Sequence, residues 1–319
     1  MTGVAGQIAF PIARMLAVDN EVWGLARFGN PDDKTRVVDA NITPVVCDLG
    51  TGNFDGVPGD FTRVIHLAAN MGPGLNYEPA IRDNAEGTGL LLQHCRSARS
   101  VLVMSTHSVY KPQDDPMFEF DESAPLGDSN STHSPSYSVS KIGQEAVARF
   151  CSRSFDLPVT IARMNASYGP NGGLPALHID ALAAGAEITT RWDPCMYSPI
   201  YEDDINAQFS SLLDAASSPA TIVNWAGDEP VSAQDWSEYA GDLMGIKARI
   251  NVVPIENTLR GSIADTTRRS AITGPCTVDW REGIRRTVAA RHPDRLVRKT
   301  GPSSPEAATS SGELRRRVL

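Results

Sequence analysis

Tyr137 and Lys141 are the residues whose types and spacing point most directly to chemistry. Positions four apart share one face of a helix, so a helix over residues 137–155 would hold an ammonium group beside a phenol. A nearby positive charge lowers the pKa of a phenol, which is about 10 when unperturbed. The pair is therefore predicted to act as acid and base near neutral pH. A surface Tyr/Lys pair on a helix is the alternative reading of the spacing alone.

Thr106 follows a predicted strand at residues 101–104 and is the third catalytic candidate. Ligands of open α/β sheets bind at the carboxyl ends of the strands. We therefore expect the Thr106 hydroxyl to hydrogen-bond the reacting oxygen and to help place its proton.

Short apolar runs alternate with helical stretches over the first half of the chain, which is the βαβ pattern of a doubly wound parallel sheet. The predicted strands are 21–25, 44–47, 63–67, 101–104 and 159–162, and the predicted helices are 6–18, 77–97 and 137–155. The fold class is α/β, a Rossmann sheet with a smaller C-terminal substrate lobe. We expect a dinucleotide-binding domain at 1–165, joined by a late strand near 199–225, a mainly substrate-binding lobe at 166–294, and a disordered tail at 295–319.

A glycine-containing loop opens the first predicted helix and is a candidate site for a pyrophosphate, because it lacks side chains where the backbone must approach the ligand. Its expected contacts are Gly3, Ala5, Gly6, Gln7 and Ile8. A plain turn before a helix is the alternative, since Ala9 stands where a third glycine is expected. The strand that should precede this loop is absent. We favour an upstream start codon over a missing central strand, which would leave neighbouring edges unpaired.

Further coenzyme contacts are expected at the ends of the next strands. Ala26 stands where an acid would accept the ribose hydroxyls, and Arg27 behind it favours the 2′-phosphate of NADP over NAD. An exposed arginine at a strand end is the alternative. Asp48 is expected near the adenine or, alternatively, as a turn cap. The remaining expected contacts are Leu49, Leu67, Ala68 and Ala69.

Composition and charge exclude several classes of protein. Hydrophobic residues make up 41% and charged residues 21%, and no apolar run approaches the roughly 18 residues of a membrane span. With no secretory signal in view, we expect a soluble cytoplasmic protein. The net charge of −9 disfavours nucleic acid as a partner. Five scattered cysteines disfavour both a disulfide framework and a zinc site, so no metal is predicted.

Six motifs, taken in order, resemble the extended short-chain dehydrogenase/reductases, and most closely the NAD-dependent epimerase/dehydratase group. They are Thr2-Gly3-xx-Gly6, the run from His66 to Ala69, Asn84, Ser105-Thr106-xx-Val109-Tyr110, Tyr137-xxx-Lys141 and Arg163-xxxx-Tyr168-Gly169-Pro170. The likeness covers about residues 2 to 290.

The resemblance implies a role for each matching residue. Tyr137 would be the acid/base, Lys141 would bind the nicotinamide ribose, Thr106 would hydrogen-bond the substrate, and Asn84 would support the catalytic helix or a water molecule. It also implies NAD or NADP as coenzyme and a homodimer formed through the helices at 77–97 and 137–155.

Three departures from the family pattern bear on the substrate. His107 and Ser108 replace the Asp-Glu pair of family dehydratases, which disfavours dehydration. Tyr197 replaces an arginine that usually meets the nucleotide of a sugar nucleotide, and Asn165 sits one place early. The expected substrate contacts are Met71, His107, Ser108, Asn165 and Tyr197.

The leading interpretation is hydride transfer at a carbinol or carbonyl carbon of a small polar substrate, with sugars among the candidates. The same residues would serve a dehydrogenase or reductase that releases its coenzyme and a nucleotide-sugar epimerase that retains NAD. A non-catalytic dinucleotide-binding regulator is the alternative from another class, which Ala9 and the missing first strand favour.

Overall fold

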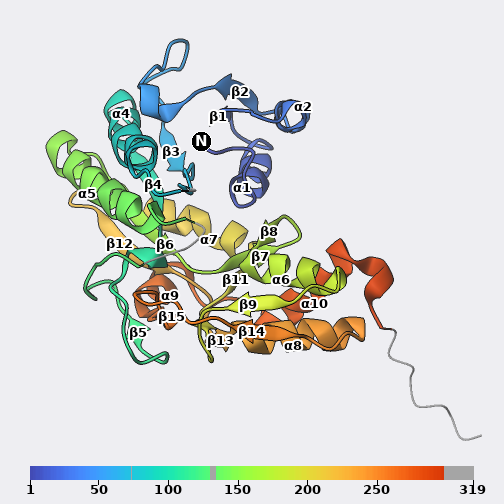
Figure 1. Cartoon of the computed structure of the whole chain (residues 1–319). Coiled ribbons are helices and arrows are strands. Elements are labelled where there is room, and N and C mark those ends of the chain that lie inside the picture. Colours follow the sequence, from blue (N-terminus) through green and yellow to red (C-terminus); the bar gives the residue numbers. More distant parts are fainter. Residues whose placement is uncertain (73, 130–133, 298–319) are drawn as a thin grey trace, which may run out of the picture.

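A parallel sheet covered by helices on both faces forms one half of the molecule, and a smaller lobe forms the other (Figure 1). This computed structural model describes residues 1–72, 74–129 and 134–297. The sheet half contains α1 (Ala9–Leu16), β1 (Trp23–Ala26), α2 (Pro31–Asp39), β2 (Thr43–Val46), β3 (Arg63–His66), α3 (Glu78–Ile81), α4 (Gly87–His94), β4 (Ser100–Thr106), α5 (Tyr137–Phe155), β6 (Val159–Met164), α7 (Glu202–Asp214) and β12 (Thr221–Trp225).

The strands of this sheet pair in parallel as β12-β6-β4-β3 and as β1-β2. The first residues of the chain lie between these two groups. The Thr2 N–H donates to the Ile65 carbonyl at 3.0 Å, and the Leu25 N–H donates to the Met1 carbonyl at 2.8 Å. Residues 1–3 thus join β1 to β3 at the carboxyl ends of the strands, where the predicted site must form. Burial lowers the pKa of the Met1 amino group to about 6.

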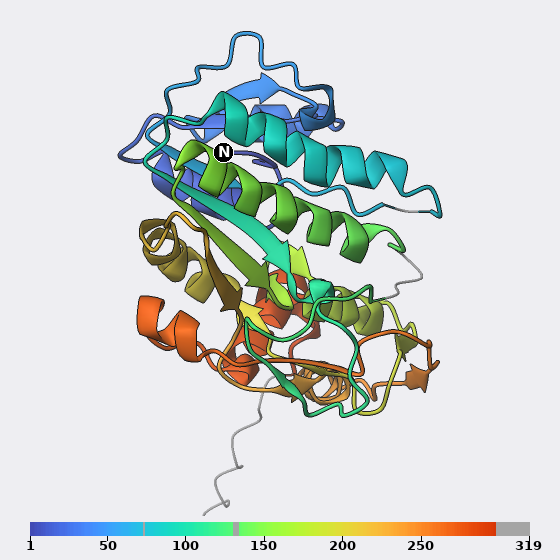
Figure 2. The ribbon, with the colours of Figure 1, turned by 90° about the vertical axis from the view of Figure 1, so that its left-hand side faces the viewer.

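Helices cover both faces of the sheet because each presents an apolar stripe to it. On one face α4 and α5 run side by side, as Figure 2 shows, and bury Leu91, Leu92 and Ala148 against the strands. On the other face α1 and α7 pack Ile12 and Leu212 into a second core cluster.

The five strands predicted from sequence are all present within a few residues of their expected ends. The helix predicted at 77–97 is interrupted: a π-helical turn at Arg82–Glu86 separates α3 from α4. The sequence pattern missed α2. Asn30 caps this helix by accepting a hydrogen bond from the Asp32 N–H at 3.1 Å, and Pro31 occupies its first position.

The smaller lobe packs three helices around Trp236, Ile284 and neighbouring apolar side chains. It contains α6 (Leu174–Ala183), α8 (Ala233–Met244) and α10 (Trp280–Arg291), with short strands β7 (Ser167–Gly169), β8 (Gly172–Gly173), β9 (Ile188–Thr190), β10 (Met196–Tyr197), β11 (Ile200–Tyr201), β13 (Val231–Ser232), β14 (Ile250–Val252) and β15 (Gly261–Ala264), while β5 (Glu119–Phe120) pairs with β15. The tail predicted to be disordered at 295–319 is ordered at its start, since Arg295 ends a 3₁₀ turn and the Val297 N–H donates to the Leu243 carbonyl at 2.9 Å. Its remainder, from 298 onward, lies outside the described residues.

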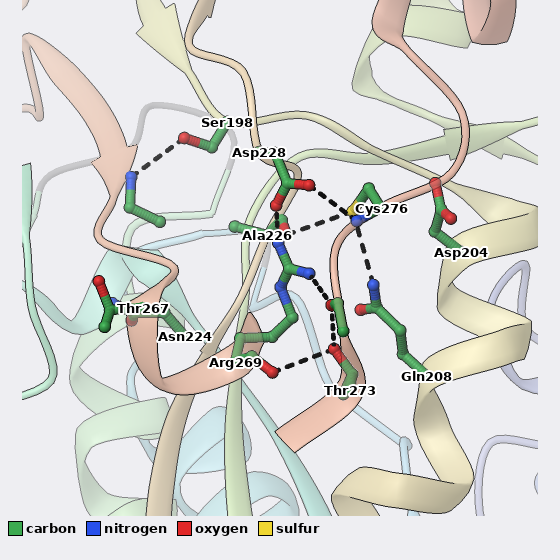
Figure 3. Close-up of polar contacts among 12 residues, drawn as sticks. Ser198, Asp204, Gln208, Asn224, Ala226, Asp228, Thr267, Arg269, Thr273 and Cys276 are labelled. Carbon is green, nitrogen blue, oxygen red and sulfur yellow. Dashed lines mark hydrogen bonds and ion pairs between the residues drawn. The ribbon is translucent and has the colours of Figure 1, made fainter. Parts of the chain in front are cut away.

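A buried arginine ties the loop before α10 to the end of the sheet (Figure 3). Arg269, on α9 (Thr267–Thr273), pairs with Asp228 and also donates to the Gly274 carbonyl at 2.8 Å. The second carboxylate oxygen of Asp228 accepts the Cys276 N–H at 2.7 Å. The carboxylate thus compensates both the buried guanidinium and a backbone donor, so this cluster serves the scaffold.

No helix within the parts of the chain that the structure describes is long and apolar enough to cross a membrane.

The core beneath the site supplies a stability prediction. Leu102 lies fully buried in the middle of β4. Truncation of Leu102 to alanine should lower the free energy of unfolding by about 2–5 kcal/mol, because a cavity replaces the lost side chain. Val18→Ala, at a position that is 77% exposed, should change it by less than about 0.5 kcal/mol. Urea unfolding of both variants checks this, and equal effects would contradict the assigned core.

Candidate active site

One cavity of about 650 Å³ opens along the carboxyl ends of the strands, where open α/β sheets bind their ligands. Its volume lies within the range usual for small-molecule sites. It begins at the loop before α1 and ends at Thr106 and Tyr137. Of the expected coenzyme contacts, those that line this cavity are Gly3, Ala5, Gly6, Gln7, Ile8, Arg27, Asp48, Leu49, Leu67, Ala68, Ala69 and Tyr137.

The glycine loop packs tightly against the end of β3. Gly3 has a φ of +66°, and a Cβ there would lie 2.8 Å from the Ala68 Cα, so a larger residue would displace the loop. Gln7 and Ile8 line the cavity directly before α1. The loop therefore fits a pyrophosphate.

The part of the cavity beside the ends of β1 and β2 is lined by Ala26, Arg27, Asp33 and Asp48. Asp48 caps the following turn by accepting the Gly50 N–H at 3.1 Å, so the turn-cap role and a place at the cavity are both present. The Arg27 guanidinium lies 3.8 Å from the Asp83 carboxylate. Sequence reasoning missed Asp33, whose only signal is an acid in the first turn of a helix that was not predicted.

The catalytic candidates meet at the opposite end. Thr106, Tyr137 and Asn84 line the cavity, whereas Lys141 is buried behind them. The Lys141 ammonium lies 5.9 Å from the centre of the Tyr137 ring and donates to the Met104 carbonyl at 2.7 Å. The residues that the spacing predicted as a pair are therefore neighbours across one helical face.

Burial dominates the pKa values of both groups. It raises the pKa of Tyr137 to about 12, an effect that a hydrogen bond with Thr106 partly opposes. It lowers the pKa of Lys141 to about 7, which the charge of Glu145 partly opposes. The prediction that the ammonium lowers the pKa of the phenol is wrong here, because burial raises the pKa of Tyr137 and only the hydrogen bond with Thr106 lowers it.

A buried ion pair holds together the elements that carry these side chains. Arg163 on β6 donates to both carboxylate oxygens of Glu145 on α5, at 2.9 and 2.7 Å. The Ser105 hydroxyl, on β4 beside Thr106, donates to the same carboxylate at 2.5 Å. Such bidentate geometry fixes orientation as well as distance.

Asn84 lies in the π-helical turn and links α5 to the loop after β3. Its side-chain N–H groups donate to the Ser140 hydroxyl at 2.9 Å and to the Asn70 carbonyl at 2.7 Å. Its oxygen accepts the Asn70 N–H at 2.7 Å. The π-helical turn that interrupts the predicted helix thus positions the Asn84 amide between α5 and Asn70 in the cavity wall.

The expected substrate contacts divide into two groups. Met71 and Asn165 line the cavity, whereas His107, Ser108 and Tyr197 are not among its lining residues.

His107 is turned into the core and is almost fully buried, where its ring packs 5.1 Å from that of Tyr110. Ser108 instead bonds to Thr106: its N–H donates to the Thr106 hydroxyl at 3.2 Å, and the Thr106 hydroxyl donates to Ser108 Oγ at 3.3 Å. Tyr197 contacts Arg191 and Cys195 in the lobe. Sequence reasoning missed five further lining residues at strand ends and loops, namely Asn70, Asp83, Met104, Met164 and Ser167.

A parallel sheet with a glycine loop and a Tyr/Lys helix on one cavity defines a dinucleotide-binding protein of the short-chain dehydrogenase/reductase type. The model of the NAD dependent epimerase/dehydratase family matches residues 1–191, and the chain belongs to this family.

Solved structures with low sequence identity share the fold. UDP-glucuronic acid 4-epimerase from Bacillus cereus has a TM-score of 0.79 at 20% identity, covering 92% of this chain and 98% of that one. The dTDP-glucose 4,6-dehydratase DesIV from Streptomyces venezuelae has a TM-score of 0.77 at 22% identity, covering 92% and 96%. UDP-glucose 4-epimerase from Thermotoga maritima has a TM-score of 0.78 at 18% identity, covering 92% and 98%.

A curated relative matches over part of its length. It is the trifunctional UDP-glucose 4,6-dehydratase/UDP-4-keto-6-deoxy-D-glucose 3,5-epimerase/UDP-4-keto-L-rhamnose-reductase of Arabidopsis thaliana, 27% identical over 200 residues. The match covers 54% of this chain and 28% of the relative.

Removal of one charge from the buried ion pair should be costly. Glu145→Gln should lower the free energy of unfolding by about 3–5 kcal/mol, because it leaves the Arg163 guanidinium buried without a carboxylate. Asp214→Asn breaks the exposed pair with Arg63, whose atoms lie 2.6 Å apart, and should cost less than about 1 kcal/mol. Chemical denaturation measures both changes. A change in the free energy of unfolding of Glu145→Gln as small as that of Asp214→Asn would contradict the role assigned to the buried ion pair.

Acid should weaken the fold through His107. Burial lowers its pKa to about 3, against about 6.5 in an unfolded chain. Between these values only the unfolded chain binds the proton, so stability falls as the pH falls from about 6.5 towards 3. His107→Gln should reduce this slope by about 1.4 kcal/mol per pH unit. Denaturation curves across the acidic range give both slopes, and parallel slopes would refute the burial of a neutral ring.

Proposed function

We propose that this protein transfers a hydride between NAD and a carbinol or carbonyl carbon of a small, polar, sugar-like substrate. One observation carries the proposal: a single cavity joins the glycine loop at one end to Thr106 and Tyr137 at the other. Membership of the NAD dependent epimerase/dehydratase family supports it. Hydride transfer needs this arrangement, because an acid/base must lie beside the carbon that exchanges the hydride.

Each catalytic candidate has a distinct role in this proposal. When bound, NAD would supply the hydride acceptor and a positive charge. Tyr137 takes a proton from the substrate hydroxyl on oxidation and returns it on reduction. The Thr106 hydroxyl holds the same oxygen, and its fixed direction follows from the bonds it makes with Ser108.

Lys141 and Asn84 would keep the phenol in place. The ammonium of Lys141 is anchored on the Met104 carbonyl, from where it would reach the nicotinamide ribose. Asn84 holds the first turns of α5 through Ser140. Both roles follow the family pattern, and the contacts of the two side chains are compatible with it.

NAD is favoured over NADP as coenzyme. The solved structures of the Bacillus cereus epimerase and of DesIV contain NAD. The preference for NADP rested on Arg27, but this side chain lies against Asp83. A cation already paired with a carboxylate is a poor partner for a 2′-phosphate.

Epimerisation or net oxidation and reduction both fit the site better than dehydration. The related structures include sugar-nucleotide epimerases and a dehydratase. Dehydration needs acid and base side chains beside Thr106, whereas here His107 is buried and Ser108 accepts a hydrogen bond from the Thr106 hydroxyl. The homodimer and the cytoplasmic location stay predictions.

The dinucleotide released when the purified protein is denatured distinguishes the remaining alternatives. Stoichiometric NAD would indicate an epimerase that retains its coenzyme through many cycles. An empty protein that binds added dinucleotide would indicate a dehydrogenase or reductase. A protein that binds neither NAD nor NADP would favour the non-catalytic regulator.

Tyr137→Phe separates proton transfer from binding. The variant should lose about 10²- to 10⁴-fold in kcat, because it removes only the transferable proton. Its dissociation constant for NAD should stay within about twofold of the wild-type value, since the phenyl ring still packs in place. Tyr239→Phe, where the ring packs on Trp280 outside the cavity, is the matched control. Undiminished turnover in Tyr137→Phe would refute the mechanism.

A further inference from the structure

The sequence motifs identify no residue that would bind the adenosine ribose. The usual acceptor of the ribose hydroxyls in such folds is an acid at the end of the second strand of the βαβ unit, and here that position is Ala26. We propose that Asp33, on helix α2, accepts these hydroxyls and thereby selects NAD over NADP. The inference rests on the proposed use of a dinucleotide and names the residue that decides which one.

The position of Asp33 supports this role. It lies in the first turn of α2, and it lines the cavity together with Ala26 and Arg27. The helix therefore brings a carboxylate to the same end of the cavity at which the strand supplies only a methyl group.

Arg36 fixes the carboxylate relative to the glycine loop. Its guanidinium lies 3.3 Å from Asp33 Oδ1 and donates to the Ala5 carbonyl at 2.7 Å. The same group stacks 4.2 Å from the centre of the Phe10 ring. Ala5 belongs to the loop that would hold the pyrophosphate. The Arg36 guanidinium therefore bridges the Asp33 carboxylate and that loop.

Asp33 is also the best placed of the cavity's carboxylates. Asp83 is occupied by Arg82 and by the Asn70 side chain, at 2.8 Å each. Asp48 caps the turn after β2. Among residues 1–72, 74–129 and 134–297, no hydrogen bond reaches Asp33 Oδ2, which leaves that oxygen for a ribose hydroxyl.

The neighbouring acid Asp32 serves as a comparison for Asp33. The helix dipole favours both acids equally, so it does not explain why only Asp33 lines the cavity. Both acids lie in the first turn of α2, where negative charge is stabilising. Asp32 is exposed and does not line the cavity, whereas Asp33 is only partly exposed and does. The two residues therefore form a matched pair with equal charge.

The charge of Asp33 gives the direction of the selectivity. A carboxylate accepts hydrogen bonds from the two ribose hydroxyls of NAD, and such bonds to a charged group are strong. In NADP a 2′-phosphate with a charge of about −1.5 to −2 would replace one hydroxyl and repel the carboxylate. Without Asp33, the Arg36 guanidinium would lose its carboxylate partner and could instead attract a 2′-phosphate.

Calorimetric titration of NAD and NADP into the wild type, Asp33→Asn and Asp32→Asn tests the inference. The wild type should bind NAD more tightly than NADP. Asp33→Asn should raise the dissociation constant for NAD by about tenfold or more and lower that for NADP, because it removes the charged acceptor and frees Arg36. Asp32→Asn should leave the ratio of the two constants within about twofold of the wild-type ratio, since it changes only distant charge.

The outcomes separate this inference from the proposed function. A shifted ratio in Asp33→Asn alone supports the inference. An unchanged ratio, an equal shift in both variants, or a wild type that prefers NADP overturns it and leaves a dinucleotide-dependent enzyme in place. A wild type that binds neither dinucleotide overturns both.

Discussion

The buried ion pair between Glu145 and Arg163 is the interaction on which the site depends. Its carboxylate takes two hydrogen bonds from the guanidinium and one from Ser105, so it joins α5, β6 and β4 at one point. These elements carry Tyr137, Thr106 and the wall of the cavity. Because loss of one partner of a buried ion pair costs about 3–5 kcal/mol, a displacement that separates Glu145 from Arg163 is strongly opposed.

A second polar network extends this control to the glycine loop. His66 at the end of β3 contacts the Thr2 hydroxyl at 2.6 Å and the Thr88 hydroxyl at 2.7 Å, while the Gln144 amide on α5 reaches Thr88 at 3.1 Å. Burial holds the pKa of His66 at about 3, so the ring stays neutral and can both donate and accept. The His66 imidazole thus connects the loop that would hold the pyrophosphate to the helix that carries Tyr137. This connection fixes the position of the loop relative to the helix.

The sequence predicted the parallel sheet, its strands and most of the cavity wall, because apolar alternation and glycine spacing are local signals. It predicted neither α2 nor the role of Asp33, since this short helix is mostly polar and buries only Val37. Its position depends on packing against β2 and on the contact of Arg36 with the glycine loop. His107 was expected at the substrate because it follows Thr106 directly, but the 3₁₀ turn at His107–Val109 directs it into the core. The raised pKa of Tyr137 was also missed, because burial depends on the whole fold and residue spacing does not report it.

We therefore propose that a single dinucleotide spans the cavity from Asp33 to Tyr137. The most direct test is a crystal structure of the protein with NAD bound. We expect the adenosine ribose beside Asp33, the pyrophosphate on the loop from Gly3 to Ile8, and the nicotinamide ring beside Tyr137 and Thr106. A dinucleotide bound in the reverse direction, or outside this cavity, would contradict this proposal.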